Sequence, residues 1–312
     1  MKLSIIIPTK DRREVFNLTI ANAIKAIEGV DAEIIVVNDS KTAMVQLPEV
    51  SSKVLLLNNP KSGVAAARNF GAANAKGEVL LFVDDDILIG KENIKAIIEA
   101  HQQFPDAALN LLWVYPPDLM NQVRETSFGR FLIKYGFTTM KEGLGSEWRD
   151  ADFIETSVAA SFFLCLSRNT FKRVGGYNEQ FPHAGSEDHD FSMRLKELGI
   201  RRGVVTSSIV FHNEMDRIQL RKWLNREEKG AESRAWGYTL GRPEIVLETP
   251  FLKSIGYSFL TLIKHLLISI QAKLPDTPEM DQLNHTLIHL LLGTSIYQGY
   301  KKGLKDVGKQ TQ

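Results

Sequence analysis

The sequence predicts an α/β fold in which a mostly parallel sheet is flanked by helices, with a helical extension at the C-terminus. Short and almost wholly apolar runs alternate with helix-length segments over the first hundred residues. Strands that are apolar on both faces are typical of a parallel sheet covered by helices. Polar residues follow these runs directly, and such sheets bind ligands beyond the carboxyl ends of their strands. The candidate site is therefore expected where the runs end.

The elements of this first part follow from periodicity and from helix-end signals. Apolar runs predict strands, apolar positions three and four apart predict helices, and Gly29 and Gly77 mark two helix ends. We expect strands over residues 3–7, 33–37, 54–57 and 79–83, and helices over residues 13–28, 64–75 and 93–104.

The pattern changes beyond residue 107. Strands are expected over residues 109–114 and 162–166, and the long aromatic-containing connection between them is typical of a binding loop. Residues 216–238, 251–273 and 280–302 show helical periodicity. His285 and His289 lie four apart in the last of these helices, but no Glu follows His285 as a metalloprotease site requires. We expect both to be packing or surface histidines.

The bulk composition excludes several classes of protein. The 312 residues have a formal net charge of +1, so the chain lacks the overall positive charge typical of nucleic-acid binding. A single cysteine, Cys165, excludes an internal disulfide framework and suits a reducing compartment. The apolar N-terminal run is too short for a signal peptide. Lys253, Lys264 and His265 interrupt residues 251–270, so we expect no spanning helix and a cytoplasmic protein.

Three acids, Asp84, Asp85 and Asp86, end the apolar run of residues 79–83. If strand alternation continues, Asp84 and Asp86 point to the same side, where their carboxylates repel each other unless a cation lies between them. A hard divalent ion such as Mg²⁺, which commonly binds substrate phosphates as well, is the natural partner. An acidic turn or helix start explains the same residues without a ligand.

A second acidic cluster lies in residues 185–195. Ser186 can cap a helix whose first turn contains Glu187 and Asp188, and capping chemistry alone accounts for much of this pattern. The helix start follows the glycine pair of residues 175–176 and a proline turn, which could hold it at the rim of a cleft. A carboxylate at that rim, facing a metal-bound diphosphate, could take a proton from an alcohol.

Taken in order, these motifs resemble family 2 glycosyltransferases with the GT-A fold. The residues that carry the resemblance are Ser4–Thr9, Val36–Ser40, Gly63–Asn69, Phe82–Asp86, Val174–Tyr177, Glu187–Asp188 and Val210–His212. The resemblance implies a nucleotide-sugar-binding half over residues 1–105, an acceptor-binding and catalytic half of the same domain over 106–215, and a C-terminal helical extension over 216–312. Asn38 departs from the family pattern, because it replaces the first of two acids after the second strand.

The resemblance implies an inverting transfer of a sugar from a nucleoside diphosphate to a hydroxyl of a glycan or lipid-linked acceptor. UDP is the expected nucleotide, Mn²⁺ or Mg²⁺ the expected cofactor, and polysaccharide biosynthesis the expected setting. Processive synthesis is not expected, because the Gln-x-x-Arg-Trp motif of processive members is off register at residues 219–223.

The family's functional residues transfer to matching positions of this chain. The nucleoside pocket and its surroundings would consist of Pro8, Thr9, Asp11, Asp39 and Arg68. Asp84 would hold the ribose or a metal-bound water, with Asp85 in the same donor-binding set. The metal ligand would be Asp86, with His212 as a further metal or diphosphate contact. The general base would be Asp188, and Glu187 would orient the acceptor.

Two other functions stay open on the sequence alone. A nucleotidyltransferase of similar fold would bind a triphosphate through Lys10, Arg12 and Arg13, and a catalytically inactive relative would only bind the nucleotide sugar. Residues 251–273 also have two interpretations, because basic residues interrupt an apolar helix. This helix packs on the catalytic domain or across a homodimer, or it docks peripherally on the inner face of the cell membrane.

Overall fold

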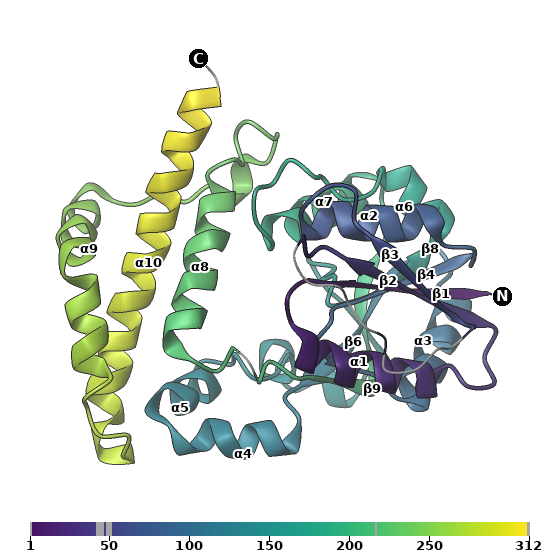
Figure 1. The fold of residues 1–312 in the computed structure, drawn as a ribbon, viewed down its shortest axis with the longest axis horizontal. Coiled ribbons are helices and arrows are strands. Elements are labelled where there is room, and N and C mark those ends of the chain that lie inside the picture. The colour runs from purple at the N-terminus through teal and green to yellow at the C-terminus, as the bar shows by residue number, and fades with distance from the viewer. Residues whose placement is uncertain (1, 42–46, 48–51, 216, 311–312) are drawn as a thin grey trace. The chain divides into compact units, whose positions relative to one another are not determined.

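A computed structural model describes residues 2–41, 47, 52–215 and 217–310 of the chain (Figure 1). The chain divides into two compact units. Unit 1 consists of Met1–Pro116, Thr139–Glu179 and Glu187–Glu214, and unit 2 of Pro117–Thr138, Gln180–Ser186 and Met215–Gln312. The three-part domain division inferred from the sequence stays a prediction.

Unit 1 contains a nine-stranded sheet within the described residues. Its strands are β1 (Leu3–Thr9), β2 (Ala32–Asn38), β3 (Val54–Asn58), β4 (Val79–Val83), β5 (Ile87–Leu88), β6 (Ala108–Val114), β7 (Phe153–Glu155), β8 (Phe163–Ser167) and β9 (Arg202–His212). They are ordered β3-β2-β1-β4-β8-β6-β9-β5, with β7 paired to β9. The first four strands of this order are parallel, and β8 is antiparallel to both of its neighbours. This arrangement confirms the mostly parallel α/β sheet expected from the sequence.

Helices cover both faces of this sheet (Figure 1). They are α1 (Arg13–Ala26) and α3 (Lys91–Gln103) on one face, and α2 (Val64–Asn74), α6 (Arg168–Val174) and α7 (Ser186–Glu197) on the other. Strand alternation explains why the strands are apolar throughout: Ile5 and Ile7 of β1 lie in the core under α1, whereas Ile6 lies in the core under α2. Two short 3₁₀ helices, Lys141–Leu144 and Glu147–Arg149, complete the unit.

Unit 2 is helical. It contains α4 (Pro117–Glu125), α5 (Ser127–Lys134), α8 (Leu220–Arg234), α9 (Phe251–Gln271) and α10 (Asp281–Gln310), with 3₁₀ turns at Pro243–Ile245 and Pro278–Met280. Its core joins Phe131 and Trp223 to residues of α10. His285 and His289 both pack against Phe131, and His285 Nε2 lies 3.1 Å from the Ser127 carbonyl oxygen. His285 is therefore a buried packing histidine, and His289 is a surface histidine that contacts the same aromatic ring.

The largest difference from the sequence-based elements lies between β6 and β8. The sequence predicts an irregular connection there, but it contains α4 and α5. Both helices are amphipathic, but they contain only nine and eight residues, a length at which a helix is hard to assign from periodicity alone. The start of α5 is fixed instead by Thr126, whose hydroxyl accepts a hydrogen bond from the Gly129 amide at 3.0 Å. The helix predicted over 216–238 is α8 at Leu220–Arg234, and Asp216 lies outside the described residues.

Glycines on α10 allow it to approach α8 closely. A Cβ atom added at Gly299 would collide with the backbone carbonyl of Glu228, and one added at Gly303 with that of Glu232. By contrast, a Cβ added at Gly230 on α8 would meet nothing within 4 Å. The packing of these two helices therefore depends on the absence of a side chain at residues 299 and 303.

This difference predicts opposite effects for two alanine substitutions. Gly299→Ala should destabilise the protein by about 1–3 kcal/mol, because the added methyl group overpacks the α8–α10 contact. Gly230→Ala should stabilise it by up to about 1 kcal/mol, because alanine loses less backbone entropy in a helix. Urea unfolding followed by circular dichroism measures both, and equal stability of the two variants would contradict the packing described here.

Candidate active site

The segments after three parallel strands meet at one edge of the sheet. The amide of Asp39, which follows β2, donates to the carbonyl of Thr9 at the end of β1 at 2.8 Å. The Thr9 hydroxyl donates in turn to Asp85 Oδ2, beyond β4, at 2.7 Å. Because parallel strands end at the same edge, these residues converge although they lie far apart in the sequence.

The three consecutive acids contact two different arginines. The strand β4 ends at Val83, so Asp84–Asp86 lie in a turn and strand alternation does not continue through them. Arg12 Nη1 lies 2.6 Å from Asp85 Oδ1 and 2.9 Å from Asp86 Oδ2, whereas Asp84 Oδ1 lies 2.7 Å from Arg68 Nη2. Asp84 and Asp86 thus contact different arginines in this structure, and their assignment to one shared cation stays a prediction.

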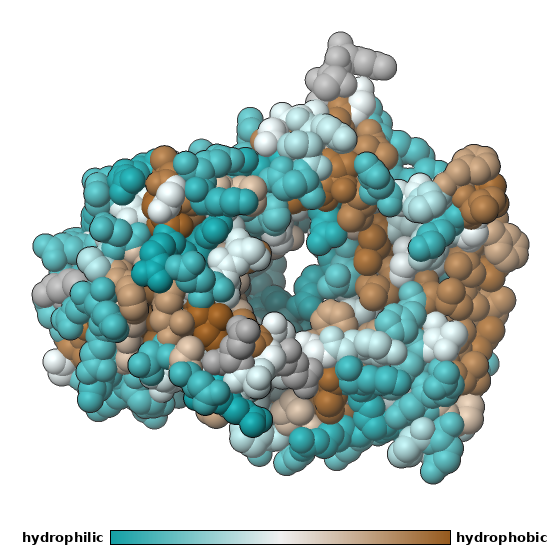
Figure 2. All heavy atoms as spheres, turned by 180° about the vertical axis from the view of Figure 1, so that it is seen from behind, coloured by the Kyte–Doolittle hydropathy of each residue, from teal (hydrophilic) through white to brown (hydrophobic). Residues whose placement is uncertain are grey.

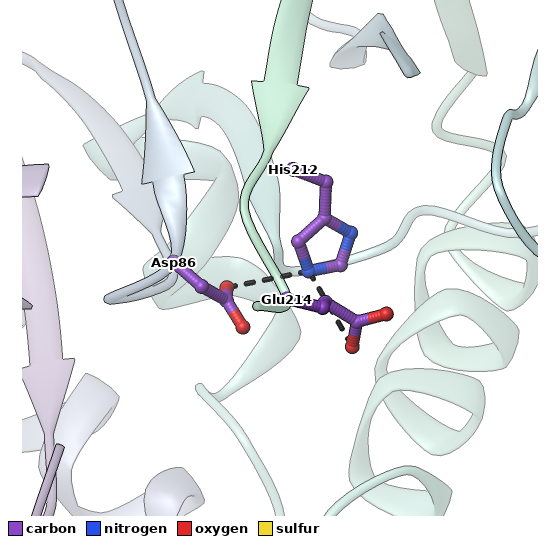
Figure 3. A group of neighbouring side chains, drawn as sticks. All are labelled: Asp86, His212 and Glu214. Carbon is purple, nitrogen blue, oxygen red and sulfur yellow. Dashed lines mark ion pairs between the residues drawn. The ribbon is translucent and has the colours of Figure 1, made fainter. Parts of the chain in front are cut away.

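Asp86 forms a compact cluster with His212 and Glu214 (Figure 3). The short strand β5 pairs antiparallel with β9 so that Ile87 lies opposite His212, which places Asp86 beside the imidazole. His212 Nε2 lies 3.3 Å from Asp86 Oδ1 and 3.8 Å from Glu214 Oε1. One ligand atom from each of the three residues lies within 4.8 Å of the other two. The β5–β9 pairing thus assembles the cluster.

The chemistry of this cluster fits a divalent metal ion. Carboxylate oxygens suit Mg²⁺ and Mn²⁺, and an imidazole extends the set toward transition metals. The side chain of Asp86 is 1% exposed and that of Glu214 is 7% exposed, so the acids are largely withdrawn from water. The Tyr115 hydroxyl donates to Glu214 Oε2 at 2.7 Å, an outer contact that orients the carboxylate.

The cluster combines two carboxylates with one imidazole, and Arg12 contacts one of the carboxylates. Burial lowers the pKa of His212, but the carboxylates of Asp86 and Glu214 outweigh that effect and raise its pKa above the ordinary value. Burial also raises the pKa of Asp85 to about 6, although Arg12 acts in the opposite direction. Acids held this close together out of water favour the binding of a cation.

The candidate nucleoside residues lie at the ends of β1 and β2. Asp39 accepts hydrogen bonds from Asn59 Nδ2 at 2.7 Å and from the Gly63 amide at 3.0 Å. Asp11 has a left-handed backbone conformation with φ of 54°, and its carboxylate accepts a hydrogen bond from the Ser40 hydroxyl at 2.5 Å. Pro8 pairs with Val37 in the sheet. The carboxylate of Asp39 is therefore held in a fixed orientation at the edge of the sheet.

Arg68 joins the two acidic motifs of the sequence. Its side chain is 3% exposed and extends from α2 toward acids from two other segments. Nη2 lies 2.7 Å from Asp84 Oδ1, and Nη1 lies 3.1 Å from Glu187 Oε1 and 3.5 Å from Asp188 Oδ1. The guanidinium thus neutralises carboxylates on both the β4 turn and α7.

Asp188 is held by a second set of contacts on its other side. The Ser161 hydroxyl donates to Asp188 Oδ1, and the Ser161 amide lies 3.3 Å from Oδ2. The Tyr177 hydroxyl lies 2.6 Å from the Ser161 hydroxyl. Burial raises the pKa of Asp188, while Arg68 and Ser161 act in the opposite direction by stabilising its charged form.

Sequence analysis missed several residues of this site. Glu214 gave a weak signal, since it lies two residues after His212 beyond the last strand. Ser161 gave no signal, because it is one of many serines and its proximity to Asp188 exists only in the fold. The sequence offers Arg12 only as a triphosphate-binding residue, whereas in the structure it contacts Asp85 and Asp86.

Comparisons with known proteins identify the family of this chain. A family model described as "Glycosyltransferase like family 2" matches residues 4–239. An uncharacterized glycosyltransferase of Haemophilus influenzae is 25% identical over 197 residues, covering 62% of this chain and 61% of the relative. Validoxylamine A glucosyltransferase of Streptomyces hygroscopicus subsp. jinggangensis is 27% identical over 221 residues, covering 64% and 52%. The chain thus spans less than two thirds of the length of these curated relatives.

Solved structures show the same fold. The mannosyltransferase PcManGT of Pyrobaculum calidifontis, solved in complex with GDP-Man and Mn²⁺, superposes with a TM-score of 0.54 at 12% identity, covering 96% of this chain and 87% of that one. GalNAc-T7, solved with UDP, GalNAc and Mn²⁺, gives a TM-score of 0.50 at 14% identity, covering 68% and 43%. These similarities confirm the GT-A fold. Because the family model spans residues 4–239, the chain belongs to glycosyltransferase family 2.

Proposed function

We propose that this protein is a metal-dependent, inverting glycosyltransferase. It would transfer a sugar from a nucleoside diphosphate, with UDP as the expected nucleotide, to a hydroxyl of a glycan or lipid-linked acceptor. One observation carries the proposal: Arg68 contacts both the candidate base Asp188 and Asp84. Asp84 lies in the same turn as Asp86, which belongs to the cluster that could hold a metal ion. Membership of the family supports the reaction class. We also infer a cytoplasmic location, which a lone buried cysteine, Cys165, fits.

The donor would lie at the carboxyl ends of β1, β2 and β4. Pro8, Thr9, Asp11 and Asp39 would line its nucleoside side, where Asp39 is already fixed by backbone and side-chain donors. Mn²⁺ or Mg²⁺ held by Asp86, His212 and Glu214 would stabilise the negative charge of the leaving diphosphate. Arg12 keeps the carboxylates of Asp85 and Asp86 in place beside this cluster.

Asp188 would act as the general base. The acceptor hydroxyl oxygen forms a bond to the anomeric carbon while the bond from that carbon to the phosphate oxygen breaks, and the diphosphate leaves with the electron pair. The hydroxyl proton passes to the Asp188 carboxylate. Attack from the side opposite the diphosphate inverts the anomeric centre. Glu187 is 2% exposed and contacts Arg68, and it would orient the acceptor.

The structure weakens the main alternative. A nucleotidyltransferase would need free basic groups for a triphosphate near the end of β1. Arg12 instead contacts Asp85 and Asp86, and Lys10 Nζ lies 3.1 Å from Asp39 Oδ2. A catalytically inactive relative differs from the proposed enzyme only in turnover, which the first experiment below measures.

Turnover of the donor should depend on a divalent metal. With a panel of nucleotide sugars, the protein should release the nucleoside diphosphate slowly to water in the presence of Mn²⁺ or Mg²⁺, and the release should stop with excess chelator. A coupled assay for the free diphosphate measures this. If neither metal supports release from any donor of the panel, the proposed transferase is refuted.

Metal affinity should depend on Glu214 and, through it, on Tyr115. Glu214→Gln should weaken Mn²⁺ binding by more than about tenfold. Tyr115→Phe should weaken it by about tenfold, because this substitution removes the hydrogen bond that orients the Glu214 carboxylate. Isothermal titration with Mn²⁺ measures the affinity. Glu155→Gln, which changes an exposed carboxylate of the same unit, is the matched control and should bind normally. Unchanged affinity in Glu214→Gln would remove this residue from the metal site.

The pH profile should report on Asp188. Its folded pKa is raised, so activity should fall as the pH drops through that value and the base becomes protonated. Ser161→Ala removes a hydrogen bond to the charged form, which raises the pKa further and moves the acidic limb of kcat/KM to higher pH. Asp188→Asn should lower kcat by about a hundredfold or more while nucleotide affinity stays the same. An acidic limb at the same pH in Ser161→Ala would exclude Asp188 as the titrating base.

A further inference from the structure

The helix α9 presents a continuous apolar face to the outside of unit 2 (Figure 2). The figure shows hydrophobic residues gathered along the edge that α9 forms. The exposed members are Phe251, Leu252, Ile255, Phe259, Leu262, Leu266 and Ile270. At 3.6 residues per turn, all of them fall within an arc of about 100° on the helix. Leu262 is 82% exposed and Phe259 61% exposed, so this face is almost wholly uncovered.

Three polar side chains of α9, those of Ser254, Ser258 and Lys264, are bonded within unit 2. Lys264 is 7% exposed, and its Nζ lies 2.7 Å from Glu228 Oε2 and 3.2 Å from Gln298 Oε1. The hydroxyls of Ser254 and Ser258 lie 3.0 and 2.9 Å from the Tyr297 hydroxyl on α10. A helix on the surface of a soluble protein normally buries its apolar face and exposes its polar one. On α9, by contrast, a buried lysine lies on the inner side while large apolar residues stay exposed on the outer side, as in a helix that contacts lipid.

The charges of α9 are all of one sign. The ionisable residues of the helix and its C-terminal flank to residue 273 are Lys253, Lys264, His265 and Lys273, and no acid occurs among them. Lys264 is paired inside unit 2, while the other three are exposed. A second copy of this face would offer the basic residues no acid of α9 to pair with. Anionic lipid head groups, by contrast, complement the basic residues while the acyl region receives the apolar ones.

The contacts of α9 place it on a membrane surface rather than across a bilayer. By length and composition the helix could cross one, with a mean hydropathy of 1.3. Its inner face, however, is tied to Glu228 of α8 and to Gln298 of α10. The sequence of α8 is LRKWLNREEKGAESR, which is far too polar to enter hydrocarbon. These neighbours must stay in water, so α9 can bury only its outer face.

We propose that α9 is a peripheral membrane anchor, whose exposed apolar face inserts into the interface of a bilayer that contains anionic lipid. The proposal does not rest on the proposed enzymatic activity, because it follows from unit 2 alone.

The test is binding of the full chain to lipid vesicles, measured by co-sedimentation. The protein should bind vesicles of phosphatidylcholine with one quarter phosphatidylglycerol, and more weakly those of phosphatidylcholine alone. The triple variant Phe259→Gln, Leu262→Gln, Leu266→Gln should lose binding by at least about tenfold, because it removes apolar area from the inserting face. The double variant Lys253→Gln, Lys273→Gln should lose the preference for phosphatidylglycerol while keeping part of the binding.

A matched control carries the same kind of change elsewhere. Leu18, Leu55 and Leu198 of unit 1 are exposed by 46%, 40% and 43%, and their triple glutamine variant should bind vesicles as the unchanged protein does. Thermal unfolding of each variant checks the fold. The donor is left out of the binding assay, so vesicle binding and enzymatic turnover can fail separately.

Two results would overturn the proposal. One is equal vesicle binding by the α9 triple variant and the unchanged protein, or binding by neither. The other is a lipid-free dimer, measured by light scattering, that the α9 variant converts to a monomer, since the apolar face would then be covered by a second copy.

Discussion

The site depends on the compensation of buried carboxylates by two arginines. Asp85, Asp86 and Glu187 are 6% exposed or less, and isolated charges at such positions would be strongly destabilising. Arg12 holds the acids after β4, and Arg68 joins that turn to the start of α7. Breaking either contact would leave uncompensated charge in the interior, so the geometry of the reacting groups and the stability of unit 1 depend on the same ion pairs.

The fold brings these groups together by strand pairing rather than by sequence proximity. Parallel β1, β2 and β4 end at one edge, and the two-residue strand β5 places Asp86 beside His212 on β9. The amide of Asn213 donates to the Asp86 carbonyl at 2.7 Å and continues this pairing past the end of the strand. The antiparallel pairing of β5 with β9 therefore adds His212 to the residues that the parallel strands bring together.

Much of the fold could be predicted because its strands are buried on both faces. The segments that form β1, β2 and β4 are apolar for that reason, and the polar residues after them mark the candidate site. The rest depends on tertiary contacts. The arginine partners of the three acids depend on the turn that begins at Asp84, and the contact of Ser161 with Asp188 exists only in the folded chain. The helices α4 and α5 are amphipathic but short, with nine and eight residues, and such lengths are hard to assign from sequence alone.

The bridging role of Arg68 limits how this site can change. A guanidinium presents donors at two fixed ends of a planar group, which lets Nη2 contact Asp84 while Nη1 contacts Glu187 and Asp188. Lysine, with a single ammonium group, cannot span both. The turn after β4 and the start of α7 therefore share one counterion, and substitutions on either side must be compatible with the other. A variant with a new substrate must therefore keep Arg68 and its carboxylate partners, or change the residues of the turn and of α7 together.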